Sequence, residues 1–350
     1  VKAAIDFAAE RGIQYVHMDA GWYGPEMKMS SDATTVSPDK DLDIPALCKY
    51  AESKGIGLMV YVNQRALVQQ LDTLLPLYKK WGLKGVKFGF VQIGNQRWST
   101  WLHDAVRKCG EYGLMVDIHD EYRPTGFSRT YPNLIGNESA RGTEYEAFGG
   151  SKPFHTTLLP FNRLIGGPMD YTPGIFDTKL DFMGDLPHGQ VQTTLAKQLA
   201  LYVTLYSPLQ MAADLVENYE KHMDAFQFIK DVAVDWDDSK YIEAEPGDYI
   251  TVARKAKGTG NWFVGGITDE NARTANFTLD FLEPGKQYVA TLYADGKDAD
   301  YKENPTSYQI KKGIVTSKTK MSVKEARSGG FALSLIEATP ADKKAVKKWR

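Results

Sequence analysis

The sequence lacks the features that mark several broad classes of protein. It has only two cysteines, Cys48 and Cys109, and they form neither a disulfide framework nor a metal-ligand spacing. No apolar run reaches the roughly 18 residues that a membrane-spanning helix requires. The 42 basic and 44 acidic residues nearly balance, and the net charge is −2. This balance gives no electrostatic reason to expect nucleic acid or an anionic membrane as a partner.

The beginning of the chain also lacks expected signals. Residues 1–12 have the pattern of an amphipathic helix that ends at Gly12. No initiator methionine, signal peptide or capping residue precedes this helix. We therefore expect the sequence to be a fragment whose upstream part is absent from this numbering.

Short apolar strands alternate with helix-like stretches in the first part of the chain. The strands are predicted at 15–19, 58–62, 85–90 and 114–119, and the helices at 45–54, 65–81 and 98–111. This alternation predicts parallel β/α units, and four repeats at this spacing favour a (β/α)8 TIM barrel over a Rossmann sheet. No Gly-x-Gly-x-x-Gly motif follows any strand, so a dinucleotide-binding interpretation has no support.

The pattern changes in the second half of the chain. A further strand is predicted at 164–171, and helices are predicted at 191–206 and 218–231. From residue 249 onward the segments alternate with period two and are separated by turns, which indicates an all-β region. The sequence therefore predicts a catalytic barrel over residues 1–235 and an all-β C-terminal domain over 236–350.

Polar residues gather where the predicted strands end. In a barrel the carboxyl ends of the strands carry the chemistry, because the following loops converge on the axis. Paired carboxylates there suit glycoside hydrolysis, and three or more suit a hard cation such as Ca²⁺. The residues selected by this rule, with the acids of the next loop, are Asp19, Asn63, Gln64, Gly89, His119, Asp120, Glu121, Glu138 and Glu144.

Simpler interpretations stay open for single residues. An acid in a loop is most often solvated, although Asp19 at a strand end is expected to bond a sugar hydroxyl. Trp22 is as consistent with packing as with a platform for a sugar ring. Asp170 and Asp214 are expected to be structural.

Three long segments carry a resemblance to glycoside hydrolase family 97, which includes inverting α-glucosidases and retaining α-galactosidases. These segments are RPTGFSRTYPNLIGNESARGTEYEAFGG (123–150), GGPMDYTPGIFDT (166–178) and residues 198–232. The resemblance covers essentially the whole chain. It implies a (β/α)8 barrel and a C-terminal β domain, preceded in the family by a β-sandwich. The sandwich and the first barrel strand are expected to be missing here, and the sandwich to pack on the barrel. The resemblance also implies a periplasmic or secreted bacterial protein.

The resemblance assigns roles to individual residues. Glu144, in the RGTE segment, matches the family's general acid, and Glu138, in NES, matches a calcium ligand. Asp120 falls beside the metal site, so Ca²⁺ is expected to be held by Glu138, Glu144 and Asp120. His119 and Lys87 match residues that contact sugar hydroxyls.

Two departures from the family pattern bear on the mechanism. Inverting members carry a base Glu near the place where this chain reads YVNQ (61–64). Retaining members carry a nucleophilic Asp where this chain has Gly89, inside VKFGF. The HMDAGWYG segment (17–24) resembles the α-galactosidase-like members. We therefore expect an exo-acting, calcium-dependent α-galactosidase of the retaining type, impaired because Gly89 replaces the nucleophile and leaves a space for a small anion.

Three alternatives stay open at this point. One is an inverting α-glucosidase of the same family that uses Asp120 as its base. Another is a non-catalytic carbohydrate-binding relative. The third is an aldolase-type barrel in which Lys87 forms a Schiff base.

Overall fold

The computed structural model describes residues 1–148, 150–180 and 189–349. These residues form two compact units. The first unit comprises Val1–Ala140 with Gly166–Asp170, and the second comprises Arg141–Ile165 with Tyr171–Arg350.

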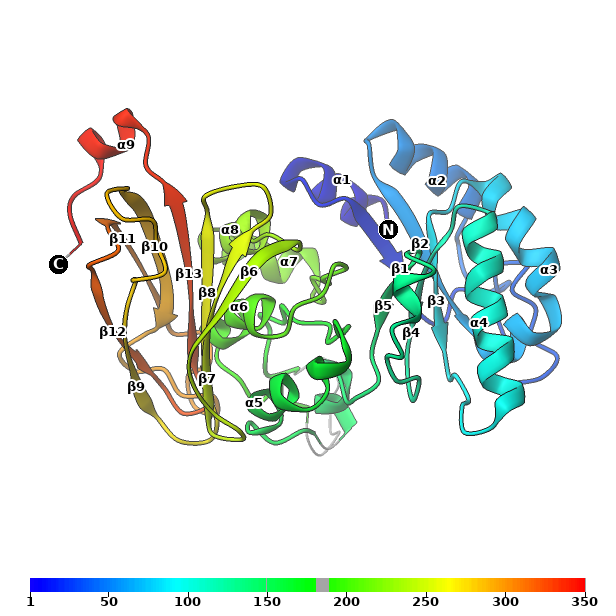
Figure 1. The fold of residues 1–350 in the computed structure, drawn as a ribbon. Coiled ribbons are helices and arrows are strands. Elements are labelled where there is room, and N and C mark those ends of the chain that lie inside the picture. The colour runs from blue at the N-terminus through cyan, green and yellow to red at the C-terminus, as the bar shows by residue number, and fades with distance from the viewer. Residues whose placement is uncertain (149, 181–188, 350) are drawn as a thin grey trace. The chain divides into compact units, whose positions relative to one another are not determined.

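The first unit is built on a parallel sheet whose strands follow chain order, β1-β2-β3-β4-β5. Helices α2, α3 and α4 lie along one side of this sheet (Figure 1). The strands are β1 (Tyr15–Met18), β2 (Gly57–Asn63), β3 (Gly85–Gly89), β4 (Met115–Ile118) and β5 (Leu134–Asn137). The helices are α1 (Lys2–Arg11), α2 (Ile44–Ser53), α3 (Gln64–Trp81) and α4 (Gln96–Glu111), with a short 3-10 turn η1 (Phe127–Arg129).

Local sequence signals explain where these helices begin and end. The side chains of Asp43 and Asn95 accept backbone N–H groups of the first turns of α2 and α4, as N-cap residues do. Helices α1 and α3 end at Gly12 and Gly82, whose φ angles of 76° and 96° are left-handed. The predicted end of the first helix at Gly12 and the predicted end of the 65–81 helix are therefore confirmed.

The early strand predictions are confirmed, with small differences at the ends, and β5 adds a fifth strand. The strand predicted at 164–171 is wrong, because the segment forms the 3-10 turn η4 (Leu164–Gly166) and then continues without strand structure. Gly167 has a φ of 137°, and Pro168 has no N–H to donate to a ladder. Closure into a (β/α)8 barrel is not shown within the described residues and stays a prediction, as does the domain boundary after residue 235.

The second unit combines short helices with antiparallel sheets. A six-stranded sheet has the order β11-β10-β13-β8-β7-β6, and β12 pairs with β9. The strands are β6 (Trp236–Glu245), β7 (Tyr249–Ala256), β8 (Trp262–Thr268), β9 (Arg273–Thr278), β10 (Tyr288–Asp295), β11 (Tyr308–Val315), β12 (Lys320–Glu325) and β13 (Gly330–Glu337). The period-two pattern therefore identified this β region correctly.

The helices of the second unit include the fully buried α6, which packs against β8 and β13. The two helical segments predicted from the sequence are confirmed as α6 and as the pair α7 and α8. The elements are η2 (Thr143–Phe148), α5 (His155–Leu158), η3 (Leu159–Phe161), α6 (Leu195–Thr204), α7 (Val216–Glu220), α8 (Met223–Asp231) and α9 (Pro340–Ala345).

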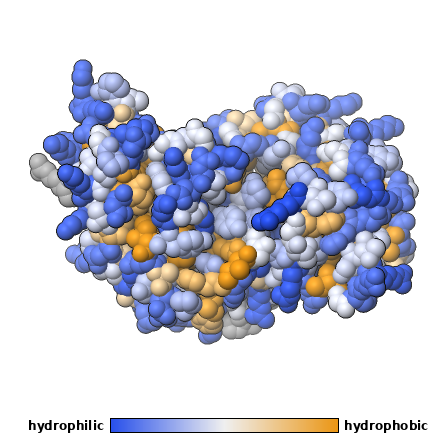
Figure 2. Space-filling view, in the orientation of Figure 1, coloured by the Kyte–Doolittle hydropathy of each residue, from blue (hydrophilic) through white to orange (hydrophobic). Residues whose placement is uncertain are grey.

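The surface carries no dominant apolar feature in the view of Figure 2. Hydrophilic residues predominate there, and apolar ones occur singly or in small groups. Scattered exposed apolar residues are normal for a folded protein and mark no binding surface by themselves. Among the described residues, no helix is both long and apolar enough to span a membrane.

Candidate active site

The strand register brings two rows of side chains to one face of the parallel sheet. Tyr61 of β2 pairs with Lys87 of β3, and Lys87 pairs with Asp117 of β4. Residues paired across parallel strands point to the same face, and side chains two positions further along point there again. The second row therefore contains the paired residues Asn63 and Gly89. These rows lie at the carboxyl ends of the strands, where barrel enzymes carry their chemistry.

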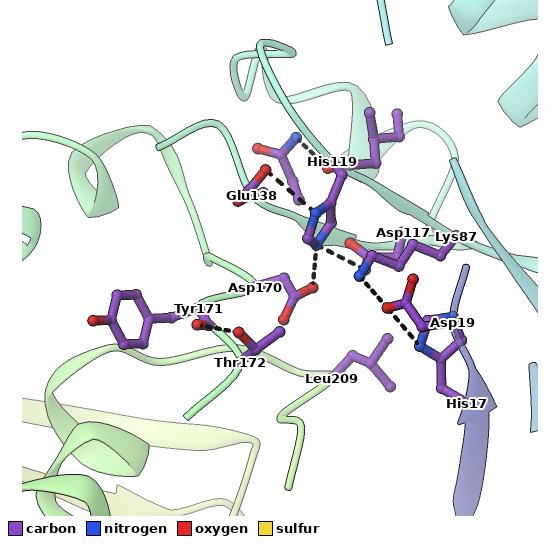
Figure 3. Close-up of polar contacts among 12 residues, drawn as sticks. His17, Asp19, Lys87, Asp117, His119, Glu138, Asp170, Tyr171, Thr172 and Leu209 are labelled. Carbon is purple, nitrogen blue, oxygen red and sulfur yellow. Dashed lines mark hydrogen bonds and ion pairs between the residues drawn. The ribbon is translucent and has the colours of Figure 1, made fainter. Parts of the chain in front are cut away.

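His119 is held by a carboxylate at each ring nitrogen (Figure 3). Its Nε2 lies 2.8 Å from Oδ2 of Asp170, and its Nδ1 lies 3.3 Å from Oε2 of Glu138. All three residues are buried. The same Oε2 of Glu138 accepts the backbone N–H of Asp120 at 2.7 Å. The imidazole orientation is therefore set from both sides.

Asp117, two residues before His119 on β4, completes this cluster. A carboxylate oxygen of Asp117, a ring nitrogen of His119 and a carboxylate oxygen of Asp170 all lie within 4.8 Å of one another. Oδ2 of Asp117 lies 3.9 Å from Nε2 of His119, beyond hydrogen-bond distance. A Cβ at Gly136 would lie 2.3 Å from Oδ1 of Asp117, so the glycine leaves room for this carboxyl group.

The charges of the cluster follow from burial and proximity. Burial and the neighbouring Asp170 raise the pKa of Asp117 well above its usual range. Burial opposes charge on Asp170 and His119 too. The hydrogen bond between them nevertheless lowers the pKa of Asp170 and, with the charge of Asp117, raises the pKa of His119 to about 9. The pair is therefore an imidazolium and a carboxylate near neutral pH.

Lys87 and Asp19 form an ion pair at the same strand ends. Nζ of Lys87 lies 2.7 Å from Oδ2 of Asp19. Lys87 is 4% exposed, whereas 53% of the Asp19 side chain is exposed. Burial opposes the ammonium charge, but Asp19 and then Asp170 raise the pKa of Lys87. Burial lowers the pKa of the adjacent His17 to about 4, so His17 is neutral near pH 7. The half-exposed side chain of Asp19 is the part of this group that solvent reaches.

Gly89 faces the ring of Tyr61. A Cβ built on Gly89 would lie 2.0 Å from Cε2 of Tyr61 and 2.5 Å from its hydroxyl oxygen. Tyr61 is only 4% exposed. The space that the sequence predicted beside Gly89 is therefore absent, because the phenol ring fills it.

Asn63 and Gln64, where inverting relatives place their base, serve the backbone instead. Oδ1 of Asn63 accepts the N–H of Arg65 at 3.0 Å and caps helix α3. Oε1 of Gln64 accepts the N–H of Gln92 at 2.7 Å. Both amides therefore hold the loops that surround the strand ends.

Asp120 also carries a backbone role. Its φ is 61°, a left-handed value that is uncommon for a residue other than glycine. Its Oδ2 accepts the N–H of Val91 at 3.0 Å, which ties the β4 end to the loop after β3. Phe90, in that loop, has a φ of 53°. One Asp120 oxygen is therefore engaged within the protein.

Trp22 is packed inside the first unit. It is 3% exposed, and its indole N–H donates to the carbonyl of Tyr61 at 2.7 Å. Its ring lies 4.8 Å from the ring of Tyr23. This burial argues against the predicted sugar platform, because the apolar face of the indole is covered by protein.

Glu144 lies in the second unit, on the short helix η2, and its side chain is exposed. It is adjacent to the buried Thr143, whose hydroxyl donates to the carbonyl of Tyr171. The structure thus gathers Asp19, Lys87, His119, Asp120 and Glu138 in one unit. The role of Glu144 remains a prediction from the resemblance.

Sequence reasoning overlooked four residues of this site. Asp170 was expected to be structural, and His17, Tyr61 and Asp117 were not selected. Asp117 carried a usable signal, since it is a charged residue within an apolar strand and precedes His119 by two positions, on the same face. The contact of Asp170 with His119 joins residues 51 apart in sequence, so no local sequence pattern predicts it.

Comparison with known proteins connects this geometry to one family. The family model described as glycoside hydrolase 97 matches residues 1–140. The model described as glycosyl-hydrolase 97 C-terminal, oligomerisation, matches residues 235–336. The chain belongs to glycoside hydrolase family 97.

Individual relatives agree with this membership. The chain is 34% identical over 344 residues to a retaining α-galactosidase of Bacteroides thetaiotaomicron, covering 95% of this chain and 50% of the relative. It is 31% identical to a probable retaining α-galactosidase of Streptomyces bingchenggensis, covering 95% of this chain and 48% of that protein. The chain thus spans about half the length of these curated relatives.

A solved structure of a family 97 enzyme from Pseudoalteromonas sp. strain K8, in complex with acarbose, is also similar. It shares 37% sequence identity and superposes with a TM-score of 0.88. The match covers 97% of this chain and 56% of that one. The fold of the described residues is therefore similar to that of about half of this family 97 enzyme.

Proposed function

We propose that this chain carries the active site of an exo-acting glycosidase of the retaining α-galactosidase type, in which Gly89 occupies the position of the nucleophile. The observation that carries the proposal is the polar cluster of Asp19, Lys87 and His119 at the strand ends. A buried ammonium, an oriented imidazolium and a partly exposed carboxylate can bind several hydroxyls of one terminal sugar. The names of the two curated relatives support α-galactosides as the ligand class.

Glu144 is the proposed general acid/base. A general acid donates its proton to the leaving oxygen, and a retaining enzyme pairs it with a carboxylate about 5–5.5 Å away that attacks the anomeric carbon. Glycine cannot make this attack. The chain as it stands is therefore expected to bind α-galactosides and to hydrolyse them very slowly.

Calcium is the proposed cofactor, held by Glu138, Asp120 and Glu144. Carboxylates are hard oxygen donors, which suit Ca²⁺. Glu138 is buried and its carboxylate is already oriented by the N–H of Asp120, while one oxygen of Asp120 is engaged by Val91. The oxygens of Glu138 and Asp120 suit the ion, and Glu144 is included on the resemblance. Bound there, Ca²⁺ would supply positive charge that keeps the two carboxylates ionised.

The inverting alternative is less well supported. Its base would be Asp120, but Oδ2 of Asp120 accepts a backbone N–H. The segment where inverting members carry their base reads YVNQ here, and the oxygens of its two amides, Asn63 and Gln64, accept backbone N–H groups. The non-catalytic carbohydrate-binding relative remains the second candidate, and the ring of Tyr61 beside Gly89 favours it, because the nucleophile position is closed.

Binding and hydrolysis together test the proposal. Calorimetry with methyl α-galactoside and methyl α-glucoside is expected to show preference for the galactoside, and Lys87→Met to weaken it. Slow release from p-nitrophenyl α-galactoside is expected to show little dependence on Glu144, because that leaving group needs little protonation. Natural α-galactosides with poor leaving groups are expected to lose their residual turnover in Glu144→Gln.

The control variant is Glu217→Gln, which changes an exposed glutamate on α7. Rapid hydrolysis with the β-anomer released first, seen by proton NMR, would show that Asp120 or another base drives inversion. Equal loss of rate on both kinds of substrate in Glu144→Gln would remove the acid assignment. Unchanged thermal stability and ligand binding after exhaustive chelation would remove calcium.

A further inference from the structure

The absence of a side chain at Gly89 has no backbone cause. Gly89 is the last residue of β3, and its φ lies outside the left-handed region that favours glycine. The other glycine of this strand, Gly85, also has an ordinary backbone. The reason for Gly89 must therefore lie in what its side chain would meet.

Tyr61 occupies that place and is held there by two hydrogen bonds and by burial of its ring. Its backbone carbonyl accepts the indole N–H of Trp22 at 2.7 Å. Its hydroxyl accepts the side-chain N–H of Asn63 at 3.3 Å, and Oδ1 of Asn63 is itself committed to helix α3. The ring is buried, so moving it away from Gly89 would require repacking of the surrounding core.

We propose that Tyr61 is a gatekeeper of the nucleophile position, so that its ring and any side chain at residue 89 compete for a single volume. This inference rests on the proposed function and deepens it. While the ring lies over Gly89, neither a carboxylate at residue 89 nor an external anion reaches the place of attack. The site then holds an intact α-glycoside, and no glycosyl-enzyme ester forms.

Tyr61 is not a substitute nucleophile. Attack by a phenol requires the phenolate or a base that takes the proton. Burial raises the pKa of Tyr61, which keeps the hydroxyl protonated. Its oxygen accepts a hydrogen bond from Asn63. Tyr61 therefore fills the nucleophile position without replacing the chemistry of a nucleophile.

The packing part of the proposal is tested by thermal unfolding of the complete protein with single and double substitutions. Gly89→Ala is expected to lower Tm in the parent and in Tyr61→Phe, because both keep the ring. In Tyr61→Ala, the same Gly89→Ala change is expected to leave Tm unchanged or to raise it. Such non-additivity is the sign that two residues share one space.

A matched control lies on the same strand. A Cβ at Gly85 would meet the flexible end of Met59 at 2.7 Å and the carbonyl oxygen of Met115 at 3.1 Å, and no ring. Gly85→Ala is therefore expected to change Tm to the same extent with Tyr61 or Ala at position 61. Additive effects of Gly89→Ala and Tyr61→Ala would overturn the proposal.

The functional part is tested with p-nitrophenyl α-galactoside. Gly89→Asp together with Tyr61→Ala is expected to turn over at least about 100-fold faster than Gly89→Asp alone. Azide is expected to accelerate Tyr61→Ala and not the parent, and to give the β-galactosyl azide. Strong activity of Gly89→Asp with Tyr61 intact would overturn the proposal.

The two proposals fail in different ways. If Gly89→Asp does not fold, the unfolding cycle with alanine at residue 89 still decides the competition for space. Clear non-additivity in Tm, with no hydrolysis and no azide response in any variant, would overturn the retaining-glycosidase function and support the packing of Tyr61 against residue 89.

Discussion

Two buried lysines, one in each unit, show how differently this protein stabilises a charge away from water. Lys87 in the parallel-sheet unit pairs with Asp19, whose side chain is about half exposed. Lys197 on α6 is fully buried, and its Nζ donates to the carbonyls of Pro153 and Thr268 and to the hydroxyl of Ser328. Burial alone thus does not distinguish a lysine proposed to bind a ligand from one that only joins parts of the fold.

The partners make the difference. The three acceptors of Lys197 come from separate parts of the second unit, so the ammonium joins them and has no donor left for a ligand. Burial lowers the pKa of Lys197 to about 8, even though Glu146 and other acids oppose this. Lys87 instead has its pKa raised by carboxylates and shares one of them with solvent. Only Lys87 can therefore replace part of its contact with Asp19 by a hydrogen bond to a ligand.

Loss of Lys197 is expected to have the largest effect on stability. Lys197→Met leaves two buried carbonyls and a hydroxyl without their donor, and each such loss costs about 1–3 kcal/mol. The free energy of unfolding is expected to fall by roughly 3 kcal/mol or more, measured by chemical denaturation. Lys230→Met, an exposed lysine on α8, is the control and is expected to change it by less than about 0.5 kcal/mol. A small effect of Lys197→Met would break the comparison.

The pH dependence of stability is expected to carry the signature of Lys197. Its pKa is about 8 in the folded protein and about 10.4 when unfolded, so the unfolded chain binds more protons between these values. Stability contributed by this group therefore rises from pH 8 to about pH 10, by an amount on the order of 3 kcal/mol. The measurement is the difference in unfolding free energy between the parent and Lys197→Met. A difference that falls over this range would contradict the lowered pKa.

Loss of Lys87 is expected to affect ligand binding more than folding. Lys87→Met leaves Asp19 with half its side chain already in water, so hydration replaces the lost partner at a cost of about 1 kcal/mol. Affinity for methyl α-galactoside is expected to fall about 10- to 100-fold, equivalent to roughly 1.4–2.7 kcal/mol. Calorimetry and thermal unfolding of the same sample separate the two effects. A stability loss as large as that of Lys197→Met would erase the distinction.

Features of the fold that depend on residues close in sequence were predicted more reliably than features that depend on distant residues. Helix ends at Gly12 and Gly82 and the period-two strands of the second unit arise from contacts between near neighbours, and the sequence predicted them. The segment 164–171 was misread because its apolar residues suggested a strand, whereas Gly167 and Pro168 turn the backbone and interrupt hydrogen bonding. Apolar content without backbone geometry was insufficient there.

The candidate site was predictable where a strand end carried a polar residue. Asp19, His119 and Asp120 were selected in this way, since parallel strands bring their carboxyl ends to one edge. Glu138 was added from the next loop, and Lys87 came only from the resemblance. Their individual roles still come from the resemblance to family 97. Trp22 shows the limit of this reasoning, because whether an aromatic ring beside a strand end faces solvent depends on what packs over it.

The sequence by itself determined the parallel strands, the helices between them and the absence of a carboxylate at residue 89. Only the tertiary structure decided what fills the space beside Gly89. The ring of Tyr61 reaches Gly89 from a neighbouring strand, and Asp170 reaches His119 across 51 residues. The sequence of a strand decides which side chains it can contribute to the site. The packing of one strand against the next decides whether an absent side chain leaves a cavity or a filled space.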